Sequence, residues 1–273
     1  PTTEADRIRS LPISSLFYIS VGMVLNADEK VAKGAFEKED LLSNVKDVIH
    51  SKAFADNLSI SRYLVSVGRY LEWNTTRVPN MVRRPTFPEL HEGPRLLFTR
   101  SGGGAITSDD MVCDQRVIIL KPWWSLAIIR NRSVQAELQN IQSLYGLTIE
   151  KVDQISRVYD LRYILALLNC SGLVARFLSQ EKRDRYDLTP DAIRQLPIRR
   201  INFTTPSAKR KQMLEQANNL YREYLRTRHW NKVLAFVDER LPQNADGTAD
   251  TEHEQSDVVH DLLAFLAEEM TRL

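Results

Sequence analysis

Side chains that could do chemistry are sparse in this sequence, apart from arginine and lysine. The five histidines form no HExxH motif, and no G-x-S-x-G elbow is present. Asp109 and Asp110 are adjacent, but they follow a glycine-rich turn at 102–104, which favours solvated carboxylates over an acid–base pair. That glycine run also lacks the spacing of a phosphate-binding loop and predicts a tight turn. We therefore expect a binding protein with no catalytic or metal-binding residue in this chain.

Basic residues are concentrated in two stretches, although the formal net charge is only +2. Residues 62–132 hold 11 Lys/Arg against 6 Asp/Glu, and residues 182–232 hold 13 against 5. Residues 238–273 reverse the balance, with 2 basic and 10 acidic residues. Basic stretches favour a polyanionic partner, and an acidic tail favours solvent or a protein partner. A nucleic acid is the polyanion that we expect for the basic stretches.

Arginines in two of these regions suit DNA recognition. The segment 75–94 carries four prolines, which restrict its backbone, and it presents three arginines that we expect near bases. The basic run at 182–185 follows an amphipathic segment, and we expect it on the phosphate backbone. The residues predicted to contact DNA are Arg77, Arg83, Arg84, Arg100, Arg116, Lys182, Arg183 and Arg185.

The elements that must position these residues differ between the two halves of the chain. Apolar and β-branched runs predict strands at 16–25, with a bend at Gly22, and at 63–70, 95–100 and 117–120. Apolar residues that recur at helical spacing predict a short helix over 39–50. From residue 133 onward helical spacing dominates, with starts at Asp160, Thr189-Pro190 and Thr205-Pro206 and a last helix at 257–273. The expected fold class is α+β.

Several single residues carry structural expectations. Cys113 and Cys170 are predicted to be buried as small apolar side chains, and at least one of Trp123 and Trp124 is predicted to lie in the core. His260 is expected at a surface or interface. The apolar stripe of the last helix needs a partner, within this chain or in another. The stripe consists of Val258, Leu262, Phe265 and Leu266.

The ends of the chain also bear on its cellular setting. The N-terminal residues show neither an initiator Met nor the pattern of a secretory signal, and no apolar run reaches the roughly 20 residues that cross a bilayer. The helical pattern continues to the final residue, so we expect a piece of a longer protein. These observations predict a cytoplasmic protein with no membrane partner.

Three motifs follow one another in this chain. The first combines YLEW at 70–73, RRPTFPEL at 83–90 and GPRLLF at 93–98. The second is YILALLNC at 163–170, and the third runs from Leu188 to the LPI at 196–198. In this order the motifs resemble the TaqI-like specificity domains of adenine-N6 DNA methyltransferases, and the resemblance covers roughly residues 10–230. Arg95 stands where the family usually has Lys, and Arg199 stands where it has a second Pro.

This resemblance implies the target-recognition region of a restriction–modification methyltransferase, including the type IIG enzymes that also cleave DNA. It implies a DNA target-recognition domain over 1–205 and a helical spacer or assembly arm over 206–273. The methylase motifs are absent, so S-adenosylmethionine is expected on a methylase domain of the parent polypeptide and no cofactor on this chain. Self-association through the C-terminal helices is a further expectation. Two alternatives remain: a protein-interaction module that docks a partner subunit through its acidic helical tail, and a nuclease with scattered ligands.

Overall fold

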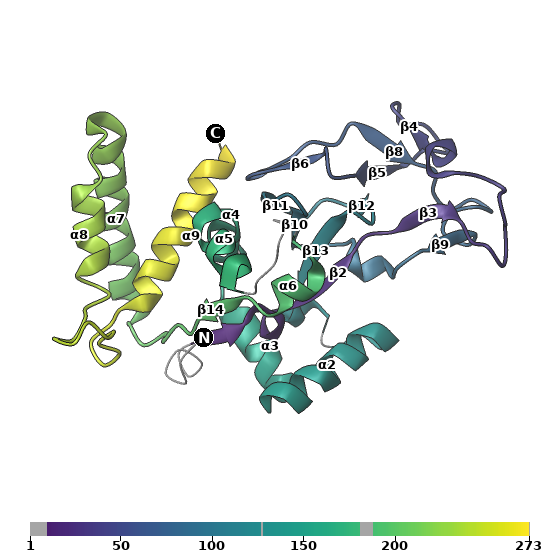
Figure 1. The fold of residues 1–273 in the computed structure, drawn as a ribbon. Helices are drawn as coiled ribbons and strands as arrows, with labels where there is room; N and C mark the ends of the chain where they lie inside the picture. Colours follow the sequence, from purple (N-terminus) through teal and green to yellow (C-terminus); the bar gives the residue numbers. More distant parts are fainter. Residues whose placement is uncertain (1–9, 127, 181–187, 273) are drawn as a thin grey trace.

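A strand-rich N-terminal part and a helical C-terminal part make up the computed structural model, which describes residues 10–126, 128–180 and 188–272 (Figure 1). The predicted α+β class is confirmed. Among the helices of these ranges, none combines the length and the apolar content that crossing a bilayer requires.

The central sheet has four antiparallel strands in the order β11-β10-β13-β2. Three of the four match the predicted strands, and β11 pairs with β10 across the predicted tight turn. Apolar runs of four to six residues account for this agreement, because strands that are buried on both faces read as continuous apolar segments. The bounds are β2 Phe17–Val21, β10 Arg95–Thr99, β11 Gly104–Thr107 and β13 Val117–Pro122.

A second sheet has the order β12-β5-β8-β4, and only its β12–β5 pair is parallel. Its strands are β4 Leu42–Ser43, β5 Lys52–Ala55, β8 Arg69–Leu71 and β12 Met111–Cys113. Three two-stranded ribbons complete the pairing, β1 with β14, β3 with β9, and β6 with β7. Their bounds are β1 Ser10–Pro12, β3 Val24–Ala27, β6 Ile60–Ser61, β7 Leu64–Val65, β9 Val82–Arg84 and β14 Pro197–Arg199.

The predicted bend at Gly22 lies between β2 and β3, and a close backbone approach explains it. A Cβ atom at this position would lie 2.0 Å from the carbonyl oxygen of Cys113. Only glycine allows two backbones to approach so closely. The bend lets β2 belong to the central sheet while β3 pairs with β9.

The predicted helix over 39–50 is wrong. The chain forms a 3-10 turn, η2, at Lys38–Leu41, then β4 and a tight loop. In that loop the Asp47 carboxylate accepts hydrogen bonds from the backbone N–H groups of Ile49 and His50, at 2.8 and 2.6 Å. Such side-chain bonds to the backbone compete with helix formation. Val48 is 96% exposed, so the apolar spacing has no buried face to match.

The helical part follows the predicted starts. The Asp160 carboxylate accepts from the N–H of Arg162 at 2.8 Å, and the Thr189 hydroxyl accepts from the N–H of Ala192 at 3.2 Å. Each side chain satisfies a donor that the first helical turn leaves free. The bounds are α2 Arg132–Tyr145, α3 Ile149–Val158, α4 Leu161–Asn169, α5 Ser171–Gln180, α6 Pro190–Arg194, α7 Ser207–Thr227, α8 Asn231–Asp238 and α9 Ser256–Arg272.

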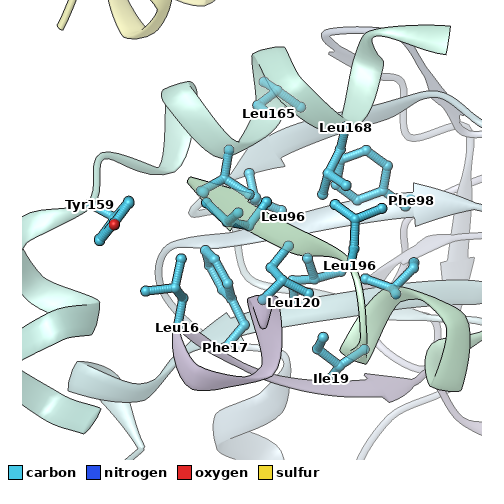
Figure 2. Close-up of a cluster of buried hydrophobic side chains, with 14 of the residues drawn as sticks. Leu16, Phe17, Ile19, Leu96, Phe98, Leu120, Tyr159, Leu165, Leu168 and Leu196 are labelled. Carbon is cyan, nitrogen blue, oxygen red and sulfur yellow. The ribbon is translucent and has the colours of Figure 1, made fainter. Parts of the chain in front are cut away.

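The central sheet is covered on both faces. On one face, sheet residues such as Leu96 and Leu120 pack against Leu165 and Leu168 of α4, as Figure 2 shows. On the other face, Leu97 packs in a cluster with Trp123 and the apolar side of α2. Neighbouring residues of a strand point to opposite faces, so Leu96 and Leu97 serve different cores. The Trp123 Nε1–H donates to the carbonyl of Ser14 at 2.7 Å, which confirms the predicted core tryptophan.

Helix α9 finds its apolar partners within the chain. Val258 and Leu262 are buried in a cluster with Ala217 of α7, and Ala264 is buried in the core cluster that contains α4. The segment expected as a spacer or assembly arm therefore also packs against the strand-rich part through α4. The predicted need of this stripe for a partner is thus met by α7 and α4.

The expectation of a surface His260 is wrong. This side chain is only 3% exposed, and its ring lies 4.6 Å from that of Tyr163, between centroids. Its Nε2 accepts a hydrogen bond from the N–H of Asp160 at 3.0 Å. The residue faces α4 rather than solvent, which its charged sequence neighbours did not indicate. The cysteine prediction is correct for the buried Cys113 and wrong for Cys170, which lies exposed between α4 and α5.

Candidate nucleic-acid interface

Two of the predicted DNA-contacting arginines, Arg100 and Arg116, come together in one pocket. They are separated by 16 positions, but the register pairs Thr99 of β10 with Val117 of β13. The residue after β10 and the residue before β13 therefore lie at the same edge of the sheet. They line an open pocket of about 410 Å³. The other residues that line it are Asn57, Thr99, Ser101 and Gln115.

The pocket is electropositive. Both arginines are exposed, and neither guanidinium has an ion pair or hydrogen bond with any of the described residues. The described lining holds no carboxylate. Asp114, two positions before Arg116, is engaged by the Lys38 ammonium at 2.7 Å. Guanidinium groups with free donors, surrounded by hydroxyl and amide groups, form a suitable site for an oxyanion such as phosphate.

The turn beside the pocket adds a third arginine that sequence reasoning missed. Gly102 and Gly103 have φ angles of 88° and 95°, so the predicted tight turn is confirmed. The Cγ atom of Arg62 lies 3.4 Å from the position that a Cβ atom would take on Gly103. Arg62 follows β6, far from Arg100 along the chain, and no motif in the sequence indicates that the two would be neighbours.

Arg83 and Arg84 lie exposed at the end of β9. Arg84 donates from Nη2 to the Ser20 hydroxyl at 3.3 Å, and Arg83 makes no side-chain contact of this kind within the described parts of the chain. The pairing of Arg84 with Val24 fixes the backbone of this ribbon. Both guanidinium groups keep free donors toward solvent.

Arg77 is held by the protein itself. Its Nε–H donates to the Glu72 carboxylate at 3.1 Å, and its guanidinium carbon lies 5.7 Å from the centre of the Phe36 ring. Burial alone would raise the pKa of the Glu72 carboxyl, but hydrogen bonds from Arg77 and Thr75 outweigh burial and hold that pKa below its usual range. The ion pair braces the proline-rich segment that leads to Arg83. Lys182, Arg183 and Arg185 lie outside the described residues.

A buried basic group lies at the opposite end of β10 from the pocket. Arg95 is fully buried and donates to the carbonyl oxygens of Gly93, Asp109 and Met111 at 2.8, 2.8 and 3.1 Å. The nearby Lys121 ammonium bonds the carbonyl of Glu92. Burial and the charge of Arg95 lower the pKa of Lys121 to about 8. The arginine at the position where the resembling family has Lys therefore ties the start of β10 to the segment 109–111.

Asn169, in the second of the resembling motifs, fixes the strand beside the pocket. Its Nδ2–H donates to the carbonyl of Gly104 at 2.9 Å, and its Oδ1 accepts from the N–H of Gly104 at 2.8 Å. A carboxamide offers both a donor and an acceptor, so it can pair with the carbonyl and the N–H of a single residue. The end of α4 is thereby attached to the start of β11, directly after the turn that borders the pocket.

Other groups that sequence reasoning weighed do not assemble into a site. Asp109 and Asp110 are exposed, as expected for a solvated turn, and Asp110 forms an ion pair with Lys52. Within the described ranges, no group of three His, Cys, Asp or Glu residues is placed to hold a metal ion. Comparison of the sequence with protein-family models and with curated proteins finds no match.

Proposed function

We propose that this chain is the DNA sequence-recognition part of a site-specific adenine-N6 DNA methyltransferase of a restriction–modification system. The observation that carries the proposal is the pocket in which Arg100 and Arg116 converge with no acidic partner among the described residues. Exposed, unneutralised guanidinium groups at the ends of rigid strands suit a fixed polyanion. The resemblance of the three sequence motifs to TaqI-like specificity domains supplies the enzyme class.

The proposal assigns two roles to the exposed arginines. Arg100 and Arg116 bind phosphate oxygens, which set the position of the protein on the duplex but carry no sequence information. Arg83 and Arg84 contact bases, where a bidentate arginine discriminates guanine from other bases by about 1–3 kcal/mol. The β3–β9 ribbon that presents them is of a type that the major groove of DNA admits.

The chemistry would take place elsewhere in the same polypeptide. A methyltransferase that acts on adenine must take the base out of the helical stack, so its recognition region has to hold the duplex in a fixed position. The proposal places S-adenosylmethionine on that methylase domain, and it places the protein in the cytoplasm with the DNA. In this proposal the chain has no catalytic residue of its own.

The test measures duplex binding by the 273-residue chain as a function of salt. Each phosphate contact that is removed should reduce the slope of log K against log salt by about 0.9. We expect Arg100→Gln and Arg116→Gln each to weaken binding equally on unrelated duplexes and to lower the slope by about one. Lys151→Gln, an exposed cation on α3, is the matched control and should bind like the wild type.

A second arm separates the role of Arg84. In the parent enzyme, Arg84→Ala should relax the methylation specificity at one base pair, while Arg100→Gln should slow methylation at all sites alike. If the wild-type chain binds no duplex at low salt, the proposed function is wrong. If it binds and both pocket variants keep wild-type affinity and slope, the phosphate contacts lie on another surface.

A further inference from the structure

The tip of the helical hairpin formed by α7 and α8 carries an unneutralised basic cluster. We call Arg222, Arg226 and Arg228 the tip arginines. All three are exposed, and within the described ranges none has an ion pair or a side-chain hydrogen bond. Two other cations of the hairpin are paired: Arg210 with Asp261 at 2.7 Å, and Lys232 with Glu223 at 2.6 Å.

The fold keeps the acidic segment between α8 and α9 away from this tip. Figure 1 shows the α7–α8 turn at one end of the hairpin and the acidic segment between α8 and α9 at the opposite end. On α9, the carboxylates of Glu268 and Glu269 are bonded by Arg272. Glu268 is also bonded by Arg162 of α4. The strongly acidic C-terminal segment therefore does not neutralise the tip arginines.

The tip is also rigid. The rings of Tyr224 and Trp230 are stacked, with centroids 3.6 Å apart and planes 26° apart, so the two helices are joined across the turn. Arg228 closes α7 in a left-handed conformation with φ 61°, and its N–H donates to the carbonyl of Tyr224 at 2.7 Å. A rigid surface loses little conformational entropy on binding. Arg222 and Arg226 are one helical turn apart, about 6 Å along the axis, close to the advance of two base-pair steps in DNA.

We propose that the tip arginines bind the phosphate backbone of duplex DNA outside the recognised sequence. This inference rests on the proposed function, and it adds a second contact surface made of residues that the recognition pocket does not use. The favourable interaction of cations with the C-terminal end of a helix explains one or two arginines in the last turn of α7. It does not explain three exposed arginines that have no ion pair with a described carboxylate and lie beside an exposed tryptophan.

The experiment compares two labelled duplexes of unrelated sequence with the full 273-residue chain. One has about 12 base pairs, just over one helical turn, and the other has about 40 base pairs, roughly four turns. The test variant is R222Q/R226Q/R228Q. The control is K30Q/K33Q/K46Q, which removes the same charge from exposed lysines in the strand-rich part. Fluorescence anisotropy gives affinity across about 50–200 mM salt.

On the long duplex, the test variant should lower the salt slope by about 2.7 relative to the wild type. On the short duplex, which only the pocket covers, the change should stay below one unit. The control should retain more than half of the salt slope that the test variant loses. Circular dichroism checks folding, and R226Q alone, with an expected loss of about 0.9, replaces the triple variant if that variant is unfolded.

Each remaining outcome overturns the inference. If the test variant binds the long duplex with wild-type slope, the tip does not contact DNA, although the proposed function stands. If the control loses as much slope, net charge and not the tip is responsible. If sedimentation shows that the variant changes self-association without changing DNA binding, the tip serves a second copy of the chain. If the wild type binds neither duplex, the proposed function fails as well.

Discussion

Acidification should destabilise this protein through His91, a buried histidine close to the cations Arg95 and Lys52. Its side chain is 3% exposed, its Nε2 lies 2.8 Å from the Thr86 hydroxyl, and its Nδ1 has no hydrogen-bond partner among the described residues. Burial, together with the charges of Arg95 and Lys52, lowers its pKa to about 3. The folded state therefore holds His91 neutral at pH values where the unfolded chain binds a proton.

The sign and size of the effect follow from proton linkage. Between the unfolded pKa of about 6.5 and the folded pKa of about 3, the unfolded state binds one more proton, so stability falls as pH falls. The slope is about 1.4 kcal/mol per pH unit for one proton. Between pH 8 and pH 4.5 the contribution of His91 to the free energy of unfolding should drop by about 3 kcal/mol.

The assay is urea unfolding followed by tryptophan fluorescence at pH 8, 6.5, 5.5 and 4.5. His91→Gln keeps a polar side chain next to Thr86 but cannot be protonated. Whatever its stability at pH 8, the variant should lose about 3 kcal/mol less than the wild type on acidification to pH 4.5. His229→Gln, which removes an exposed histidine, should run parallel to the wild type. Parallel curves for wild type and His91→Gln would refute the reasoning.

Two further predictions concern backbone contacts. Asn169→Ala leaves the buried N–H of Gly104 unpaired, whereas the Gly104 carbonyl keeps its bond from the N–H of Tyr63, and the change should cost about 2 kcal/mol in urea unfolding. Asn169→Asp should recover part of that stability only at acidic pH, where the protonated carboxyl can again donate; equal loss at all pH values would contradict this. Gly22→Ala should cost about 3 kcal/mol or more, because the new Cβ would meet the Cys113 carbonyl. Gly172→Ala, which meets open space in α5, is the control and should gain up to about 1 kcal/mol; a similar loss in both variants would contradict the steric argument.

Local patterns were sufficient for the elements whose signals lie within a few residues. The apolar run at 117–120 became the central strand β13, and Asp160 and Thr189 cap the helices that they were predicted to start. The α+β class follows from the change in periodicity near residue 133. These features depend on propensity and capping, which act between near neighbours in the chain.

The same local patterns were misleading where burial depends on distant partners. The apolar spacing over 39–50 predicted a helix, but no element covers that side, so the Asp47 hydrogen bonds determine the conformation instead. His260 looked like a surface residue until α9 packed on α4. Whether a side chain is exposed depends on which distant element packs over it. The residues next to it in the sequence do not indicate this packing.

The candidate interface was likewise predictable only in part. The amino-acid sequence by itself determined that arginines are concentrated in two stretches and that a glycine turn lies between two apolar strands. Only the tertiary structure decided which arginines meet: the register of β10 and β13 brings Arg100 and Arg116 into one pocket, while Glu72 removes Arg77 from the set with free donors. Strand register and ion pairing join residues that are remote in sequence, and their geometry exists only once the sheet has formed.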